Sequence, residues 1–259
     1  MGLMDSTRQN NCNYAHISDV GCVRELNEDT LFVSDRLWLV ADGMGGHACG
    51  EVASQLAAKT ISSEFSKTGL LPQAIQTAHL KVVEAGEKGV GQSGMGTTVV
   101  ALISLREGFE IAWVGDSRAY LWEIKKKRLT QLTEDHSLIV RLINSGLITR
   151  EDAKQHPQRH MITQCLGSVE IKNVQVDTYQ GRWQGNQQIL LCSDGLTDDV
   201  EESEIVSVLK QSSSNDEKLA ALVDLAKSKG GKDNISIILV ESPVTGELSL
   251  WEKLKSIFK

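Results

Sequence analysis

The sequence predicts an α+β fold with largely antiparallel sheets, and two observations lead to this fold class. Short segments rich in β-branched, aromatic and other apolar residues recur along the chain, as expected of sheet strands. Segments in which apolar residues have helical spacing come in blocks. A parallel sheet of βαβ units would instead have a helix after each strand.

The elements are expected in a definite order along the chain. Two strands come first, at 30–33 (T-L-F-V) and 37–41 (L-W-L-V-A), and two long helices at 51–65 and 71–86 follow them. Strands dominate the middle of the chain, and further helices precede the last strand. The remaining expected strands are 97–104, 110–114, 119–123, 174–179, 188–192 and 234–240, and the remaining expected helices are 137–145, 203–209 and 217–228.

The chain is expected to form one globular domain over residues 14–242. Its 259 residues contain 41% hydrophobic and 24% charged residues, which is ordinary globular usage, and no Gly/Ser-rich linker divides it. Residues 1–13 are expected to be a polar leader. Residues 243–259 form an amphipathic tail with Leu248, Trp251 and Leu254 near one helical face. Such a stripe either docks a partner or membrane surface, or packs on its own domain.

Composition excludes several classes of function. A net charge of −7 disfavours nucleic acid as the main partner. The five cysteines are scattered without the spacing of a zinc or redox motif, so they are expected to be reduced thiols in the cytoplasm. No uncharged apolar run is long enough to span a bilayer, and the N-terminus lacks the apolar segment of an export signal. A monomer is the default expectation.

Acidic residues beside glycine or asparagine recur at the ends of the expected strands. They occur in the sequences N-E-D (27–29), D-G (42–43), D-S (116–117), D-G (194–195) and D-N (233–234). A single Asp-Gly pair simply favours a turn. If two sheets pack face to face, however, several such aspartates can converge at one edge and offer hard oxygen ligands to Mg²⁺ or Mn²⁺. Zinc and an EF-hand calcium loop are disfavoured because their ligand patterns are absent.

Six motifs in this order resemble the PPM (type 2C) protein phosphatases, particularly their compact bacterial branch. The motifs span residues 18 to 240 and are S-D-V-G-C-V-R-E-L-N-E-D-T, V-A-D-G-M-G-G-H, G-M-G-T-T, W-V-G-D-S-R-A-Y, L-L-C-S-D-G-L-T-D-D and G-K-D-N-I-S. The resemblance implies a four-layer αββα sandwich with two central antiparallel sheets flanked by helices. It also implies hydrolysis of phosphoserine and phosphothreonine on proteins by direct attack of a metal-bridging hydroxide.

The resemblance also assigns metal-binding roles to individual positions. Asp42 would bridge two Mn²⁺ or Mg²⁺ ions and Gly43 would offer its backbone carbonyl, while Asp194 and Asp233 would complete the shell of one ion. The remaining positions have outer or weaker roles: Glu28 and Asp29 would hold metal-bound waters, and Asp116 and Asp198, with Asp194, would hold a weaker third ion.

Two further residues match catalytic positions of the family. Arg24 would grip the substrate phosphate, which suits the planar donors of a guanidinium. His47 would protonate the leaving seryl or threonyl oxygen; alternatively, it hydrogen-bonds only water or a metal ligand. The other five histidines have no comparable context. Cys192 follows two leucines and is expected to be a buried strand thiol, not a nucleophile.

Residues 133–160 match the variable flap that borders the active site in this family, and ordinary helical cover is the alternative interpretation. The expected partners are phosphorylated proteins and an opposing bacterial Ser/Thr kinase. Two other functions stay open: hydrolysis of small phosphoesters, and a catalytically silent regulatory module on the same fold. Because every metal-ligand position and the phosphate arginine are present, the silent module is disfavoured.

Overall fold

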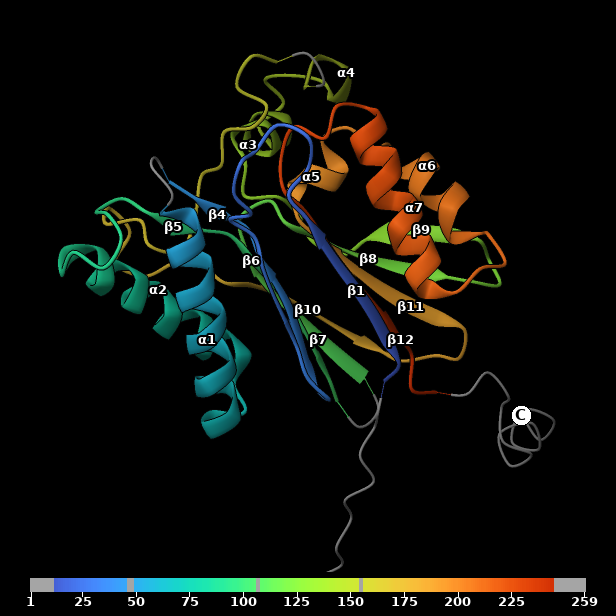
Figure 1. Cartoon of the computed structure of the whole chain (residues 1–259), viewed down its shortest axis with the longest axis horizontal. Helices are drawn as coiled ribbons and strands as arrows, with labels where there is room; N and C mark the ends of the chain where they lie inside the picture. The colour runs from blue at the N-terminus through green and yellow to red at the C-terminus, as the bar shows by residue number, and fades with distance from the viewer. Residues whose placement is uncertain (1–11, 46–48, 106–107, 154–155, 245–259) are drawn as a thin grey trace, which may run out of the picture.

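Two five-stranded antiparallel sheets form the centre of the molecule (Figure 1). The computed structural model describes residues 12–45, 49–105, 108–153 and 156–244. The first sheet has the order β1-β12-β11-β8-β9 and contains β1 (Tyr14–Asp19), β12 (Ile235–Glu241), β11 (Gln187–Cys192), β8 (Arg118–Glu123) and β9 (Arg128–Gln131). The second has the order β10-β7-β6-β3-β2 and contains β10 (Asp177–Arg182), β7 (Gly108–Val114), β6 (Val99–Ser104), β3 (Leu37–Ala41) and β2 (Thr30–Val33).

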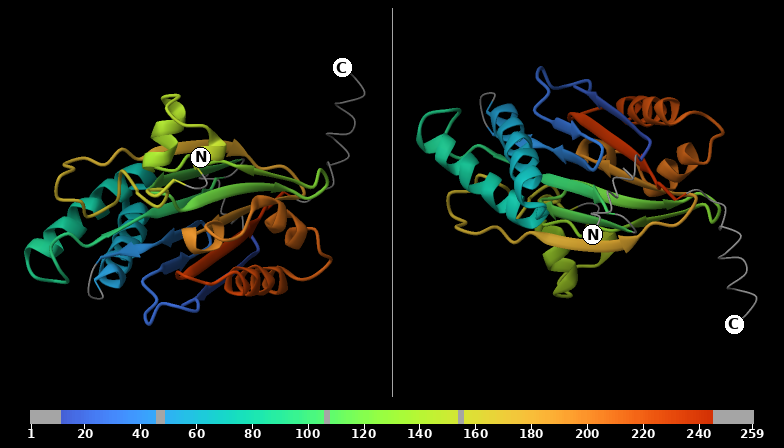
Figure 2. Two further views of the ribbon diagram at one scale, coloured as in Figure 1. Left: turned by 90° about the horizontal axis from the view of Figure 1, so that it is seen from above. Right: turned by 90° about the horizontal axis from the view of Figure 1, so that it is seen from below.

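Helices cover the outer face of each sheet, which confirms the αββα sandwich (Figure 2). Helices α1 (Gly50–Thr68) and α2 (Leu71–Glu87) pack on the second sheet through a cluster that includes Leu39, Ala57 and Ile75. On the first sheet lie α5 (Asp194–Thr197), α6 (Glu202–Leu209) and α7 (Asn215–Ser228), whose cluster includes Leu222 and Ile237. Every one of these five residues is 0% exposed, so two separate outer cores hold the helices in place.

The inner faces of the two sheets form a third core. Trp38 and Val40 of β3 meet Ile189 and Leu191 of β11 and Ile238 of β12 in one buried cluster. The central strands β3, β6, β11 and β12 are therefore apolar on both faces, because each separates two cores. This packing joins the sheets and fixes which strand ends lie at the same edge of the sandwich.

The flap projects from one end of the sandwich between β9 and β10. It contains α3 (Leu138–Asn144) and α4 (Arg150–Ala153), and Figure 1 shows both helices above the strand ends. The Ser137 side chain caps α3 by accepting the Val140 N–H at 3.3 Å. An isolated antiparallel bridge between Ser137 and Ile162 closes the neck of the flap.

Most of the expected elements occur within three residues of their predicted bounds; one expected strand is divided in two and another is shifted along the chain. The segment 97–104 divides into β5 (Gly96–Thr97), which pairs with β4 (Gly43–Met44), and β6, because the Thr98 N–H leaves the ladder to donate to the Asp42 carbonyl at 2.8 Å. The strand expected at 174–179 instead spans 177–182. Val174 packs outside the ladder in the α1–α2 core, while the strand continues to pair along β7 as far as Gly108.

The predicted leader and the predicted tail lie largely outside the described residues. Cys12 and Asn13, the last residues of the expected leader, already contact the sandwich: Cys12 is 6% exposed, and the Asn13 carbonyl accepts the Glu241 N–H at 2.8 Å. Residues 245–259, which carry the predicted amphipathic stripe, and His47 lie outside the described part. Within that part, no helix is both long and apolar enough to cross a membrane.

Candidate metal centre and active site

Asp42 and Asp194 come from different sheets and meet at one end of the sandwich. Asp42 follows β3, and Asp194 follows β11. Desolvation by the surrounding protein raises the pKa of Asp42 well above its usual range, and the charges of Asp194, Asp29 and Asp116 raise it further. The pKa of Asp194 is also raised well above its usual range, by desolvation and then by the charge of Asp116. Such mutual effects require closely spaced carboxylates in a poorly solvated site.

Glu28 and Asp29 lie on the loop that leads into β2. Glu28 Oε1 accepts the backbone N–H of Gly50, the first residue of α1, at 3.1 Å. Asp29 Oδ2 accepts the hydroxyl of Ser193 at 2.8 Å, which joins this loop to the end of β11. Desolvation raises the pKa of Asp29 to about 6. Hydrogen bonds to the start of α1 and to the residue after β11 thus hold the two carboxylates in place.

Asn234 connects this loop to the start of β12. Its amide nitrogen donates to the carbonyls of Val20 and Leu26 at 3.0 and 2.9 Å, and its oxygen accepts the Glu28 N–H at 2.7 Å. The side chain of Asn234 therefore holds the segment that carries Arg24 and Glu28 against the strand that Asp233 precedes. Sequence analysis gave Asn234 no role; its position beside Asp233 at a strand end was the available signal.

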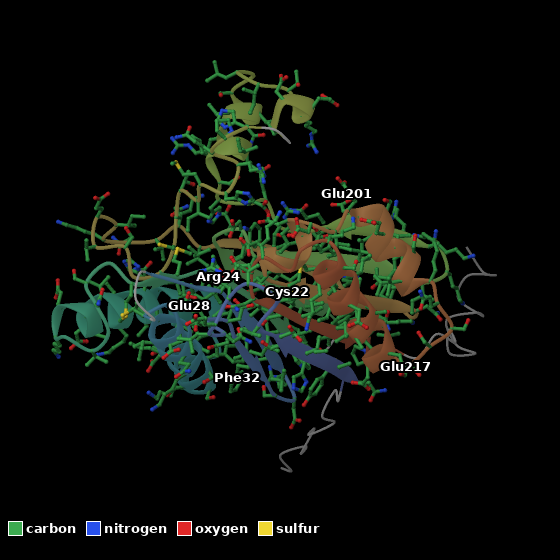
Figure 3. All side chains as sticks on the ribbon, turned by 45° about the horizontal axis from the view of Figure 1, so that its top comes forward. Cys22, Arg24, Glu28, Phe32, Glu201 and Glu217 are labelled. Atoms are coloured by element: carbon green, nitrogen blue, oxygen red, sulfur yellow. The ribbon has the colours of Figure 1, made fainter. Side chains whose placement is uncertain are left out.

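Arg24 and Asp233 form an ion pair at the opening of the site. Their Nη2 and Oδ2 atoms are 2.8 Å apart, and their side chains are 48% and 35% exposed. The hydrogen bond to Asp233 is the main cause that raises the pKa of Arg24. Figure 3 shows Arg24 close to Glu28, whose charge also acts on it. Because an exposed ion pair is weak, the Arg24 guanidinium can exchange Asp233 for another anion.

Gly43 lies where the backbone of the site is tightly packed. Its N–H donates to the Glu28 carbonyl at 3.2 Å. A Cβ atom at this position would be 2.2 Å from the Gly50 carbonyl oxygen and 2.5 Å from that of Glu28, so no side chain fits. This close approach joins the turn after Asp42 to the start of α1.

Asp116 and Asp198 lie on the flap side of the centre. Desolvation raises the pKa of Asp116 to about 7, with a further contribution from the charge of Asp135. Desolvation also raises the pKa of Asp198, whereas His160 opposes that rise from 3.0 Å away, measured between Nδ1 and Oδ2. The sequence around His160 did not predict this pair, because the two residues lie far apart along the chain.

The donor set fits hard divalent cations, although it is not a preformed cage. Asp194 Oδ1 is buried and has no hydrogen-bond partner within the described structure, and an unpaired carboxylate oxygen in such a place requires a cation or a proton. Among the described residues, no three acidic, histidine or cysteine side chains already stand as a complete metal-binding set. The fit therefore rests on two properties that the carboxylates share: they are shielded from water, and they repel one another. Both properties show that the carboxylates lie close together, and neither gives the positions of atoms around a bound ion.

Cys192 does not contribute a nucleophile. It is 0% exposed on β11, and desolvation raises the pKa of its thiol to about 12. A thiol with such a pKa is almost entirely protonated at neutral pH. The predicted buried strand thiol is confirmed.

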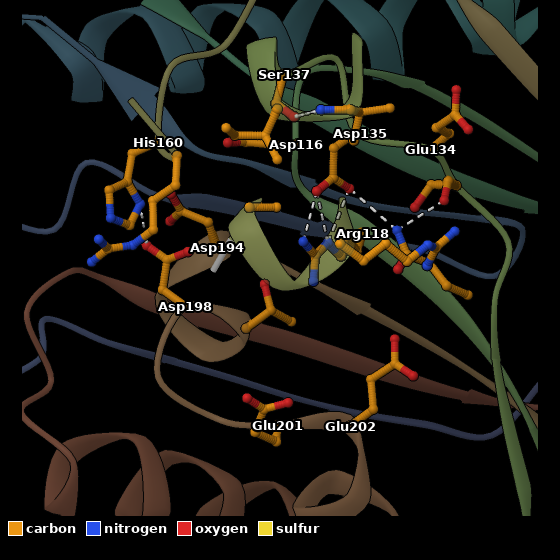
Figure 4. Close-up of a pocket in the computed structure, with 18 of the residues that line it drawn as sticks. Asp116, Arg118, Glu134, Asp135, Ser137, His160, Asp194, Asp198, Glu201 and Glu202 are labelled. Carbon is orange, nitrogen blue, oxygen red and sulfur yellow. Dashed lines mark hydrogen bonds and ion pairs between the residues drawn. The ribbon is translucent and has the colours of Figure 1, made fainter. Parts of the chain in front are cut away.

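A cleft of about 900 Å³ extends from the carboxylates to the flap (Figure 4). Asp194 lines its inner end, and Glu201 and Glu202 at the start of α6 line one wall. On the opposite wall, Arg118 donates to both carboxylate oxygens of Asp135, with the shortest distance at 2.6 Å. The lining of the cleft is predominantly acidic, because it contains eight aspartate and glutamate residues and three arginines, one of which is paired with Asp135.

Comparison with known proteins gives consistent matches over most of the chain. Residues 23–228 match the family described as protein phosphatase 2C. The serine/threonine phosphatase stp of Listeria welshimeri is 41% identical over 239 residues, which cover 86% of this chain and 93% of the relative.

Two solved structures extend these matches to the fold. The crystal structure of the Mycobacterium tuberculosis serine/threonine phosphatase PstP/Ppp is 34% identical with a TM-score of 0.81, and the match covers 89% of this chain and 98% of that chain. The catalytic domain of the phosphatase PstP in complex with two manganese ions is 32% identical with a TM-score of 0.76. That match covers 89% of this chain and 97% of the other.

Proposed function

The chain belongs to the protein phosphatase 2C family, and on that premise we propose which of its residues carry out the chemistry. It is a metal-dependent serine/threonine phosphatase that acts on phosphoproteins. The observation that carries the residue assignment is the convergence of Asp42 and Asp194 from the two sheets. It is strengthened by the buried, unpartnered oxygen of Asp194.

Mn²⁺ or Mg²⁺ would be held by oxygen atoms from both sheets. Asp42, the Gly43 carbonyl, Asp194 and Asp233 would hold the ions directly. Glu28 and Asp29 would accept hydrogen bonds from water around the ions. When bound, the ions would supply positive charge beside the phosphoryl group and lower the pKa of nearby water.

A third, weaker ion would lie on the flap side, held by Asp116, Asp194 and Asp198. The exposed side chain of Asp198, which is 40% accessible and paired with His160, supports lower affinity here. Asp198 would have to break its ion pair with His160 and its contacts with water before binding a cation, and this cost lowers its affinity.

Arg24 and His47 would act on the substrate itself. Arg24 would leave Asp233 and donate to two phosphoryl oxygens, which orients the phosphate and offsets its charge. Water would attack phosphorus directly as the bond to the seryl or threonyl oxygen breaks. His47 would then give that oxygen its proton, so that alcohol and phosphate leave without a phosphoenzyme.

The flap cleft favours a polypeptide substrate over a small phosphoester. Its volume of about 900 Å³ exceeds the space that a phosphoryl group needs, and it opens directly from Asp194. Residues on either side of the phosphorylated side chain would lie between the flap and the start of α6.

Other aspects of the function follow from the reaction itself. Phosphoserine and phosphothreonine are made by Ser/Thr protein kinases, so we propose such a kinase as the opposing enzyme. A monomer that works in the cytoplasm stays a prediction, which light scattering of the purified protein and fractionation of cells would test.

The proposal is tested by metal add-back to chelator-stripped protein. Phosphate release is measured from a phosphothreonine peptide and from p-nitrophenyl phosphate, with Mn²⁺, Mg²⁺, Ca²⁺ or Zn²⁺ added separately and with Asp194→Asn as the matched variant. Activity restored by Mn²⁺ or Mg²⁺ and absent in the variant is the expected result. A preference for p-nitrophenyl phosphate in kcat/KM would favour a small-phosphoester hydrolase, and no hydrolysis with any metal would leave the silent module.

A further inference from the structure

The β8–β9 hairpin carries a basic cluster at its tip. Four consecutive basic residues, Lys125 to Arg128, follow Ile124, and all five side chains are exposed. The tip is a turn in which the Lys127 N–H donates to the Ile124 carbonyl at 3.3 Å. Lys127 itself has φ of +51°, a left-handed conformation that favours glycine. The geometry of the turn therefore does not require a lysine at this position.

Only part of this positive charge is neutralised by the described part of the chain. Glu123, at the end of β8, forms ion pairs with Lys126 and Arg128 at 2.7 and 2.5 Å. Within the described residues, Lys125 and Lys127 form no ion pair. Four cations thus share one carboxylate, although the whole chain has a formal net charge of −7. The tip is a local positive patch on an acidic protein.

The hairpin tip lies at the end of the sandwich opposite the carboxylate site. Glu123 pairs with Gln187 at the start of β11, whereas Asp194 follows the other end of that strand. Figure 1 shows the hairpin extending away from the flap helices α3 and α4. A surface bound by the tip would therefore leave the active site uncovered.

The C-terminal tail leaves the domain beside this hairpin. The Ile124 N–H donates to the Asn186 carbonyl at 3.0 Å, and the Ser242 N–H donates to the carbonyl of the next residue, Gln187, at 2.9 Å. The described chain ends two residues after Ser242, at Val244, which is exposed. The amphipathic tail that the sequence predicts therefore begins next to the basic tip.

The tail combines the same two kinds of side chain as the tip. Its sequence places Leu248, Trp251 and Leu254 near one helical face and also contains three lysines. Apolar side chains interleaved with cations suit the surface of an anionic bilayer, where the apolar groups enter the headgroup region and the cations bind lipid phosphates. A nucleic acid presents phosphates without an apolar layer beneath them, so a bilayer is the better match.

We infer that the β8–β9 tip and the C-terminal tail together bind the surface of an anionic lipid bilayer. Lys125 and Lys127 would bind lipid phosphates, while Ile124 and Trp251 would enter the headgroup region. The cytoplasmic leaflet carries the anionic lipids and faces the compartment predicted for this chain. Because one weak anchor gives only reversible binding, two adjacent anchors are needed for stable attachment. The phosphatase would then work with its carboxylate site at the end away from the membrane.

A double substitution at the tip separates its charge from its structure. Lys125→Gln with Lys127→Gln removes the two cations that are not paired with Glu123, so the ion pairs that hold the hairpin remain. The matched control is Lys59→Gln with Lys172→Gln. These two lysines are also exposed and unpaired within the described structure, but they lie on α1 and on the segment before β10.

The test is co-sedimentation of the full chain with vesicles of phosphatidylcholine, either alone or mixed equally with phosphatidylglycerol. At about 1 mM lipid, even a weak anchor with an association constant of ~10⁴ M⁻¹ is detected. The wild type should bind only the mixed vesicles. It should be released in about 1 M salt, where the screening length falls to ~3 Å.

The variants should divide into two groups. Lys125→Gln with Lys127→Gln should weaken binding roughly 10- to 30-fold, because each basic residue near an anionic surface contributes about fivefold. Trp251→Gln with Leu254→Gln should weaken it at least about tenfold through lost apolar burial. The control variant should stay within about twofold of the wild type.

Several results would overturn the inference. These are no binding to the mixed vesicles, equal binding to both kinds of vesicle, and equal losses in the tip and control variants. A loss confined to the tail variant would remove the tip from the binding surface. Tighter binding of a DNA duplex than of the mixed vesicles would assign the tip to nucleic acid. None of these measurements needs phosphatase activity, so a failure of the proposed function would be seen separately.

Discussion

Asp42 and Asp194 are carboxylates whose nearest charges are those of other carboxylates. Each is held in place by polypeptide packing: the Asp42 backbone is bonded to Thr98, and Asp194 begins the short helix α5 after β11. The protein therefore concentrates negative charge in a poorly solvated place, which is unfavourable without cations. The crowding of these buried carboxylates predicts how the stability of the metal-free protein depends on pH.

Metal-free protein should lose stability as pH rises from about 4 to about 7, the interval between the ordinary and the raised pKa values. The pKa of Asp29 is raised from 3.8 to about 6 and that of Asp116 from 3.8 to about 7. The folded protein keeps protons that the unfolded chain has released, so this stabilisation is complete below pH 3.8 and is lost as pH passes these raised values. Thermal unfolding in chelator should show a falling midpoint, at ~2–4 °C per kcal/mol for a chain of this size.

Saturating Mn²⁺ should remove most of this slope, and Asp116→Asn should reduce it in chelator. If the midpoint of thermal unfolding in chelator rises with pH across this interval, ionisation of the carboxylates does not destabilise the folded protein. That result would contradict the proposal that they are crowded together.

Arg24→Lys should impair catalysis although it keeps the charge. A lysine offers one ammonium group where the guanidinium offers two parallel donors to phosphoryl oxygens. We expect kcat/KM for a phosphothreonine peptide to fall on the order of 10²-fold, as for loss of a donor to transition-state charge. Arg36→Lys, an exposed arginine outside the site, is the control and should change nothing. Equal kinetics for Arg24→Lys and wild type would remove Arg24 from the phosphate-binding role.

The helices and strands show how far local sequence determines the structure. The apolar runs at 30–33 and 37–41 predicted β2 and β3 to the residue. Strand β3 is buried on both faces and therefore leaves an uninterrupted apolar pattern, whereas the edge strand β2 is only partly buried. Helix α7 begins two residues before its predicted start. Ser214 and Glu217 form a capping box there, a signal that lay in the sequence unused.

Other elements depend on contacts that no local pattern contains. Strand β1 carries the mixed sequence Y-A-H-I-S-D and exists because it pairs with β12, more than two hundred residues later. The same distinction holds for the site. The Asp-Gly and Asp-Asn signals located the carboxylates, whereas Ser193 with Asp29 and His160 with Asp198 are pairs that only the folded chain creates.

The start of α6 should influence which phosphopeptides are used. Glu202 is exposed and lines the acidic cleft, so it would attract arginine or lysine beside the phosphorylated residue. Glu202→Gln should lower kcat/KM about two- to fivefold for a phosphothreonine peptide with flanking arginines, as expected of one exposed ion pair. Hydrolysis of p-nitrophenyl phosphate should not change.

Asp216→Asn is the matched control for Glu202→Gln. Asp216 is also an exposed acidic residue in the first turn of a helix, but it does not line the cleft. An equal loss for both variants, or a loss for p-nitrophenyl phosphate, would mean that net charge or helix stability is responsible, not the cleft.

At the scale of the whole molecule, the sandwich supplies the site by bringing the ends of two sheets together. The inter-sheet core, which includes Trp38, Ile189 and Ile238, sets the distance between β3 and β11 and thus between the carboxylates that follow them. Neither sheet alone contains the full ligand set. Metal binding and the packing of the sandwich should therefore depend on each other.

Removal of residues 245–259 should leave the chemistry intact. All three hydrophobic cores and every described site residue lie before residue 245. A chain ending at 244 should hydrolyse p-nitrophenyl phosphate with kcat/KM within about twofold of the full chain, because domains commonly tolerate the removal of terminal segments. If this activity is lost while the shortened chain keeps its circular dichroism, the tail must take part in the site.

The most direct test of the account is Mn²⁺ binding to chelator-stripped protein at pH 7, measured by calorimetry for the wild type and Asp194→Asn. The account predicts at least two tightly bound ions in the wild type. It also predicts loss of at least one of them in the variant, whose amide keeps the size of Asp194 without its charge. Identical stoichiometry and affinity in the two proteins would contradict the claim that Asp194 and the carboxylates around it hold the metal.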